Sequence, residues 1–201
     1  MRKSVWIFVF VLMSMPSLSR GEQPTDVLKK SIEEGIRILK DPQYQHASQK
    51  EKQKERLRQV SQNIFDFVLF SRLVLASNWK NFTQQQQREF SVVFAKFVSE
   101  FYLSKLQEKY KEEKVIYVGE DLMAGSRARV RVKVLWKGQE VPVEVWMVRR
   151  HGTWKVCDIS ALGVSAVRIY RAQFRAILLK DSPAQVIERI KERIRQPFLP
   201  P

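Results

Sequence analysis

Two carboxylates stand within otherwise apolar sequence and are the best candidates in the chain for acid–base chemistry. Asp66 interrupts "NIFDFVLF", and Asp158 follows the cysteine of "WKVCDIS". A desolvated carboxylate can act as a general base, but in such a setting it is more often held by an arginine or by backbone donors. The arginines that qualify as partners are Arg72, Arg168 and Arg171. We therefore expect structural roles for both carboxylates.

The other reactive residue types form no catalytic or metal-binding pattern. His46 lies in a polar segment and His151 in a predicted hairpin turn, and neither has a neighbour that would orient it. The single cysteine, Cys157, cannot form an internal disulfide, and its strand-like setting predicts a small buried residue rather than a nucleophile. The sequence has no histidine pair at ligand spacing, no phosphate-binding glycine loop and no serine elbow. It predicts no catalytic residue, no metal and no cofactor.

Apolar and aromatic side chains are abundant instead. The run "NIFDFVLFSRLVL" from Asn63 to Leu75 is too short to cross a bilayer, which takes about 20 apolar residues. Further along, phenylalanines fall on one helical face at Phe90, Phe94, Phe97 and Phe101. Such residues either fill a solid core or line a ligand cavity, because binding pockets are concave and mostly apolar. Periodicity alone does not choose between these two interpretations.

Helical periodicity covers the first half of the chain. A helix begins at Pro24, and its apolar face is formed by Leu28, Ile32, Ile36 and Leu39. Another begins near Ala47 or Ser48 and continues through Leu75, where it becomes apolar nearly all round and is expected to be buried on every side. Thr83 and Gln86 form a capping box that starts the phenylalanine-rich helix.

Two further helices close the chain. The first brings together on one face Val167, Tyr170, Phe174 and Ile177. The second starts at Ser182, with Pro183 behind it, and carries Val186, Ile187, Ile190 and Ile194.

Between these helical regions the sequence alternates with period two, as half-buried antiparallel strands do. The inward positions are Val130, Val132, Val134, Trp136, Val141, Val143, Val145 and Met147. Lys137–Gly138 and "RRHG" mark turns, "VIYVG" predicts an additional strand, and Pro142 indicates an edge position or a bulge. The chain therefore reads as an α+β domain, with a curved antiparallel sheet of about four strands covered on one face by several helices.

The N-terminus has the pattern of a secretory signal. Arg2 and Lys3 precede an apolar stretch from Val5 to Met13, and small residues follow up to Ser19. We expect a cleaved signal peptide over residues 1–20, export, and a single domain over residues 21–201. The alternative, a membrane anchor, is disfavoured because the apolar stretch is about half a spanning length.

The formal net charge of +15 bears on the partners of an exported protein. Outside the cytoplasm this charge does not indicate nucleic acid, and the anionic surfaces available are membranes and acidic proteins. Each lysine or arginine near an anionic bilayer contributes about 1 kcal/mol. We expect transient contact with an anionic membrane surface and no nucleic-acid partner.

A family resemblance rests on "WKVCDISALGVSAVRIYRAQFRAIL", Trp154 to Leu178. It is similar to the most recognisable stretch of the periplasmic phospholipid-binding proteins of the toluene tolerance (MlaC) family. The residues that carry the resemblance are Trp154, Asp158, Gly163, Val164, Ser165, Tyr170, Arg171 and Phe174. Upstream, "IFDFVLFSRLVLASNW" resembles the helical half of the same family. Ser77, Asn78 and Asp181 stand where the family has glycine, which bears on loop geometry more than on function.

The resemblance implies a non-enzymatic periplasmic carrier with a hydrophobic lipid cavity between sheet and helices. Such carriers shuttle phospholipid between an outer-membrane lipoprotein complex and an inner-membrane ABC transporter with an MCE-domain subunit, which maintains outer-membrane lipid asymmetry. On this basis the candidate lipid-binding residues are Phe67, Phe70, Leu73, Trp79, Phe90, Phe94, Phe97, Phe101, Val132, Val134, Trp136, Val143, Val145, Met147, Val164, Tyr170 and Phe174.

Three alternatives remain open at the level of sequence. The hopanoid-associated branch of the same family is similar enough that the identity of the lipid is not fixed. A structural or adaptor protein of the envelope would use the same apolar residues to fill a solid core. A secreted hydrolase on a related fold would depend on Asp66, Asp158 or His151.

Overall fold

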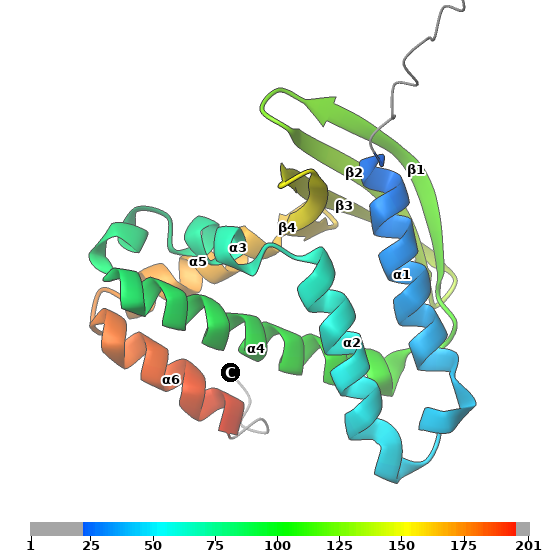
Figure 1. Ribbon diagram of the computed structural model, residues 1–201, viewed down its shortest axis with the longest axis horizontal. Helices are drawn as coiled ribbons and strands as arrows, with labels where there is room; N and C mark the ends of the chain where they lie inside the picture. The colour runs from blue at the N-terminus through cyan, green and yellow to red at the C-terminus, as the bar shows by residue number, and fades with distance from the viewer. Residues whose placement is uncertain (1–21, 196–201) are drawn as a thin grey trace, which may run out of the picture.

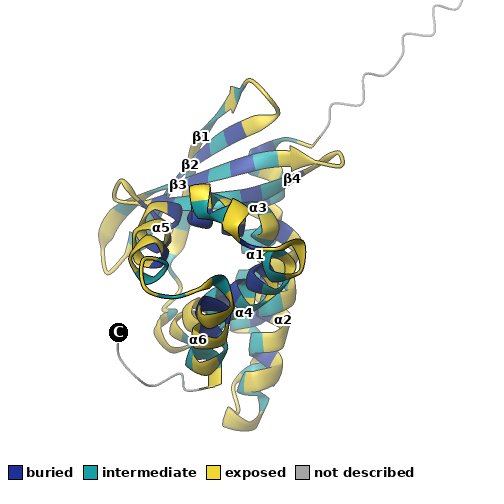
Figure 2. Ribbon diagram, turned by 90° about the vertical axis from the view of Figure 1, so that its left-hand side faces the viewer, coloured by how far each residue is buried: buried dark blue, intermediate teal, exposed yellow. Residues whose placement is uncertain are grey.

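The computed structural model describes residues 22–195, so the predicted signal peptide lies outside the described residues. The described chain has an α+β fold in which α-helices pack on an antiparallel sheet (Figure 1). In Figure 2 the strands form the upper layer and the helices lie below them. None of the helices within residues 22–195 combines the length and the hydropathy that a membrane span requires.

The helices flank the sheet in sequence. Before it come α1 (Pro24–Lys40), α2 (Lys50–Ile64), α3 (Phe67–Leu75) and α4 (Gln84–Lys109), with short 3₁₀ turns η1 (Pro42–Tyr44), η2 (Ala47–Gln49) and η3 (Ala76–Asn81) between them. After the sheet come α5 (Ala166–Ile177) and α6 (Pro183–Arg195). Thr83 and Gln86 form the expected capping box at the start of α4.

The sheet is a five-stranded meander in the order β1-β2-β3-β4-β5. Its strands are β1 (Lys114–Met123), β2 (Arg127–Trp136), β3 (Gln139–Arg150), β4 (Thr153–Ala161) and β5 (Val164–Ser165). The sequence predicted about four strands. The fifth strand, β5, was missed because two residues are too few to show a periodic pattern. Both residues of the β2–β3 turn, Lys137 and Gly138, have positive φ, as the tight hairpin turns that match strand twist require.

Pro142 is not at an edge, contrary to the sequence-based expectation. Strand β3 lies between β2 and β4, and its register shift falls between Trp146 and Met147 rather than at the proline. A proline has no N–H to donate to a strand ladder. It is tolerated here because β3 pairs with β4 only from Val143 onward, opposite Ala161, so Pro142 lies outside that ladder.

The expected continuous helix from residue 47 to Leu75 is broken at Phe65 and Asp66. Phe65 is extended and bridges Val156 of β4, while the Asp66 amide donates to the Val156 carbonyl at 2.8 Å. The Asp66 carboxylate then caps α3 by accepting from the Leu69 amide at 2.8 Å. An aspartate that caps a new helix competes with helix continuation. The expectation of burial on all sides is also wrong, since Val68 on α3 is 61% exposed.

Two separate apolar clusters hold the two layers. The sheet core contains inward residues of β2–β4 packed against α1 and α2, namely Leu28, Ile64, Ala128, Val130, Val132, Val145, Met147, Trp154 and Val156. The helical core joins α3, α4, α5 and α6 through Phe70, Val74, Leu75, Phe82, Phe90, Phe94, Val167, Tyr170, Phe174, Val186, Ile187 and Ile190. A smaller cluster of Ile38, Leu57 and Leu103 joins α1, α2 and α4.

Hydrogen bonds and ion pairs join α2 to α1 and α4. The buried Gln53 amide donates to the carbonyl of Ile38 at 3.0 Å, and Gln107 of α4 donates to the Gln53 side-chain oxygen at 2.9 Å. Glu100 of α4 pairs with Lys54 and Arg58 of α2. Burial alone would raise the pKa of Glu100, but the hydrogen bonds and charges of Lys54 and Arg58 outweigh it and hold that pKa below its ordinary value.

We expect Glu100→Gln to destabilise the fold at pH 7 by about 1 kcal/mol, because the cluster is partly open to solvent. A lowered folded-state pKa contributes stability above the ordinary pKa of the carboxyl and loses it as pH falls through the folded value. The variant should therefore lose less stability than the parent between about pH 5 and 3 in thermal unfolding. Glu192→Gln, on the exposed side of α6, is the matched control. Equal pH profiles for parent and Glu100→Gln would contradict the assignment.

Candidate functional site

A cavity of about 840 Å³ lies between the helices and one end of the sheet. Its wall is drawn from α1, α2, α3, the C-terminal half of α4, the sheet and α5. The apolar lining residues are Ile32, Ile36, Leu39, Leu57, Val60, Phe65, Phe67, Phe70, Val98, Tyr102, Leu103, Leu106, Val115, Val134, Trp136, Ile159, Ala161, Val164, Ala166, Ile169 and Tyr170. The helical core and the smaller cluster border it directly, through Phe70, Tyr170, Leu57 and Leu103. The sheet core is reached through residues packed against it, namely Ile32, Phe65, Val115 and Ile159, so the cavity lies between the three clusters.

One end of the cavity is open. Exposed side chains border it there, and we call them the mouth: Tyr102, Leu106, Trp136, Val164 and Ile169. Charged lining residues come from the end of α4 and the segment after it, namely Lys105, Lys109 and Glu113. Away from the mouth the cavity meets Phe70, Leu57 and Leu103, all of them buried. The cavity is therefore apolar within, and charged side chains join the apolar ones where it opens.

A space of this size and lining favours an apolar occupant. If it were sealed and dry, about 840 Å³ would cost roughly 20 kcal/mol at about 24 cal/mol per Å³, which exceeds the stability of a typical domain. Water would leave the apolar side chains hydrated. A hydrocarbon ligand would restore dispersion contacts and exclude water at the same time.

Tyr170 forms part of the wall between the cavity and the helical core. Its ring meets Phe70 edge-on at 6.3 Å and Phe94 at 5.1 Å between centroids. Burial, followed by the neighbouring Tyr102, raises the pKa of Tyr170, so its phenol stays protonated and neutral. Its ring therefore gives the cavity an uncharged aromatic wall.

Asp158 positions α5 beside the cavity. Its carboxylate accepts from the amides of Ile159 at 2.8 Å and Val167 at 3.0 Å, and from the Ser165 hydroxyl at 2.5 Å. The Ser165 hydroxyl also caps α5 by accepting from the Arg168 amide. Backbone donors thus hold this carboxylate, as expected, and the arginines suggested from sequence do not.

Arg168 and Arg171 bind backbone carbonyls instead, and Asp66 pairs with an arginine that was not among the candidates. Arg171 donates to the Leu73 carbonyl at 2.7 Å and so joins α5 to α3, while Arg168 donates to the Gly163 carbonyl. Asp66 pairs with Arg150, whose Nε lies 3.3 Å from the carboxylate. This pairing joins distant parts of the chain and left no trace in the local sequence.

The remaining reactive residues lie apart from one another. His46 precedes η2, and His151 occupies the β3–β4 turn. Burial, together with the charges of Asp158 and Asp66, raises the pKa of Cys157 to about 11, so it is a thiol at neutral pH. Within residues 22–195 there is no cluster of histidine, cysteine and acidic side chains suited to a metal ion.

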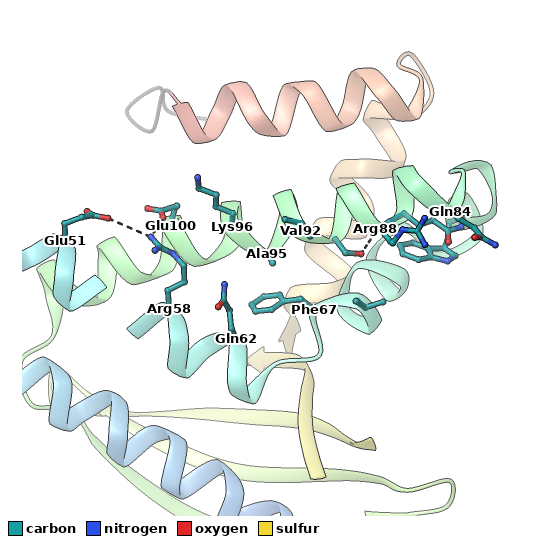
Figure 3. Close-up of a pocket in the computed structure, with 14 residues that line it drawn as sticks. Glu51, Arg58, Gln62, Phe67, Gln84, Arg88, Val92, Ala95, Lys96 and Glu100 are labelled. Atoms are coloured by element: carbon teal, nitrogen blue, oxygen red, sulfur yellow. Dashed lines mark hydrogen bonds and ion pairs between the residues drawn. The ribbon is translucent and has the colours of Figure 1, made fainter. Parts of the chain in front are cut away.

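A second hollow, of about 1050 Å³, lies between α4 and the segment formed by α2 and α3 (Figure 3). We call it the outer groove. Figure 3 shows Arg58, Gln62 and Phe67 on one side of it and Val92 and Lys96 of α4 on the other. Ion-paired and amide side chains make up much of its lining, so it suits hydrocarbon less well than the cavity does. Phe67 borders both hollows.

The candidate binding residues are divided between these places. Those that line the cavity are Phe67, Phe70, Val134, Trp136, Val164 and Tyr170. Trp79 lines the outer groove, and Phe97 and Phe174 line a hollow between α4, α5 and α6. Packed within or against the two cores are Leu73, Phe90, Phe94, Val132, Val143, Val145 and Met147, and Phe101 is exposed at 43%.

Sequence reasoning missed much of the cavity wall. Ile32, Ile36 and Leu39 were recognised as an apolar stripe, and all three line the cavity, while Ile32 and Leu39 also pack against the sheet core and the smaller cluster. On α4 the wall is formed by Val98, Tyr102 and Leu106, offset from the phenylalanine stripe that packs against α5. In the sequence, this wall was indicated only by the weaker apolar stripe of Val98, Tyr102 and Leu106 beside the phenylalanines.

The comparisons with known proteins agree with this geometry. The sequence matches the family described as "MlaC protein" over residues 29–192. The chain belongs to the MlaC family. No curated protein matches it. Among solved structures, a phospholipid-binding protein from Ralstonia solanacearum, in complex with a phospholipid, is similar with a TM-score of 0.75 and 20% identity. The match covers 87% of this chain and 98% of that one, so the two share a fold.

In this MlaC-family chain the recognisable motif builds the corner between sheet and α5. Leu162 and Gly163 both have positive φ and turn β4 into β5, which brings Ser165 opposite Ser160 and within reach of Asp158. The motif therefore fixes the frame of the cavity beside the mouth. Most of the apolar wall lies outside it.

We expect Asp158→Ala to destabilise the protein by about 2–4 kcal/mol, because buried donors at the start of α5 lose their acceptor. Asp158→Asn retains a carbonyl oxygen for the two amides and should cost roughly half as much. Urea denaturation measures both. If Asp158→Ala unfolded at the same midpoint as the parent, Asp158 would not have this structural role.

Proposed function

We infer that the chain is a phospholipid carrier of the periplasm, with acyl chains in the cavity and the headgroup near the mouth. The observation that carries this proposal is a large apolar cavity, open at one end, in a fold shared with a phospholipid-bound protein. Family membership supports a binding or carrier protein rather than an enzyme.

Transfer energetics make such a cavity necessary for a carrier. Exposing a diacyl lipid to water would cost about 0.8 kcal/mol per methylene, or more than about 20 kcal/mol for some 30 methylenes. If the acyl chains move from the bilayer interior to a cavity with apolar walls, they are not exposed to water and this cost is nearly cancelled. Loading and release then become reversible, as a shuttle requires.

The proposed setting is an envelope transport system. The carrier would exchange lipid between an outer-membrane lipoprotein complex and an inner-membrane ABC transporter that has an MCE-domain subunit. Because the hydrocarbon wall forms most of the site and charges occur only at its opening, we propose that selection depends mainly on the acyl chains. The cavity is lined by few groups able to recognise one headgroup, among them Lys105, Lys109 and Glu113.

The direct test is mass spectrometry of lipids extracted from gently purified protein. We expect phospholipid in stoichiometric amount from the parent. Val134→Trp, which fills the cavity from β2, should reduce occupancy severalfold with little loss of stability. In a solid core the same overpacking would cost about 1–3 kcal/mol.

Val92→Trp is the matched control, because Val92 is exposed at 70% in the outer groove. It should leave occupancy unchanged. Repeated absence of phospholipid from the parent would refute the carrier and favour an adaptor protein. If Val92→Trp lost the bound lipid and Val134→Trp did not, the lipid site would lie in the outer groove instead of the cavity.

A further inference from the structure

The surface around the mouth combines exposed apolar and cationic side chains. Besides the mouth residues, Phe101 of α4 and Leu162 of the β4–β5 turn are exposed next to it, at 43% and 68%. Phe101 contacts Tyr102 at 5.1 Å between ring centroids, and Leu162 lies between the cavity-lining Ala161 and Val164. We call the mouth together with Phe101 and Leu162 the rim.

Lysines lie directly on the aromatic rings of the rim. The ammonium of Lys105 is 3.9 Å from the Phe101 ring centroid, and that of Lys137 is 4.8 Å from the Trp136 ring. Lys105, Lys109 and Lys137 make no ion pair with any described residue. Of the acids in this part of the chain, Glu113 accepts from the Lys111 amide at 2.9 Å and Glu112 pairs with Lys40 at 2.9 Å. The three lysines at the rim are therefore not held in ion pairs within the described fold.

We propose that the rim docks directly on the surface of an anionic phospholipid bilayer. Aromatic side chains with lysines whose alkyl stems lie along apolar surface are the combination found at membrane interfaces. Apolar side chains would enter the headgroup region, and the lysines would meet anionic lipid. This inference rests on the proposed carrier function, because it gives acyl chains a path from bilayer to cavity that avoids water.

Charge and geometry favour a bilayer over a protein as the occupant. The net charge of +15 attracts any anionic surface, and an anionic bilayer in addition holds the cargo itself at the opening where the rim lies. Val164, Trp136 and Ile169 belong both to the rim and to the cavity wall, so the docking surface and the binding site are continuous. A partner protein on this surface would have to provide an apolar path of its own.

The test is flotation with vesicles of phosphatidylcholine alone or with about 30% phosphatidylglycerol. We expect the protein to bind the anionic vesicles, with affinity that falls as salt rises. The double variant Leu162→Ser/Lys137→Glu changes Leu162 of the rim and the lysine over the rim residue Trp136, neither of which lines the cavity, and it should bind about tenfold more weakly or worse. Leu179→Ser/Lys180→Glu, in the exposed segment between α5 and α6, is the matched control and should bind like the parent.

Copurified phospholipid, measured on the same samples, separates this inference from the carrier function. Lipid-loaded protein whose vesicle binding is equal in parent and rim variant would overturn docking and leave the carrier intact, favouring a protein partner at the rim. Rim-dependent vesicle binding by protein that carries no phospholipid would support docking and refute the carrier. If the rim variant and the Leu179→Ser/Lys180→Glu control lost vesicle binding equally, the loss would be explained by net charge alone. That result would overturn docking through the rim.

Discussion

The structure depends on one constraint, namely that the sheet and the helices do not share a single core. The sheet packs on α1 and α2, the helices α3–α6 pack on one another, and apolar side chains from both sides face the gap. Apolar walls that stay in contact with water forgo the free energy that their burial would release. An apolar occupant would supply that burial, in line with the proposed carrier function.

The frame around the cavity is held by polar contacts at its periphery. Thr25 at the start of α1 donates to Glu120 of β1, and the Trp154 indole donates to the Glu22 carbonyl, so α1 is fixed to the sheet at its first turn. Gln53 and Asp158 hold the other helix ends. Since these bonds lie outside the apolar lining, the cavity can exchange its contents without breaking them.

The helix break at Asp66 illustrates how local and tertiary signals combine. Sequence periodicity continues through this point, and an aspartate within a helix is unfavourable only by a fraction of a kcal/mol. The pairing of Phe65 with Val156, 91 residues away, makes a break the better solution. As a result Phe67 is turned to the boundary between the cavity and the outer groove, a position that no continuous helix would predict.

The sequence by itself determined the α+β class, the capping box of α4, the alternation that turns Val130, Val132 and Val134 inward, and the motif of the MlaC family. These features depend on neighbours a few residues apart, which periodicity and capping rules describe. Only the tertiary structure decided which apolar stripes pack and which remain free. Phe90 and Phe94 are fully buried against α5, whereas Tyr102 and Leu106 on the same helix border the opening. A side chain that packs and one that lines a cavity are equally apolar, and the difference lies in whether another element reaches them.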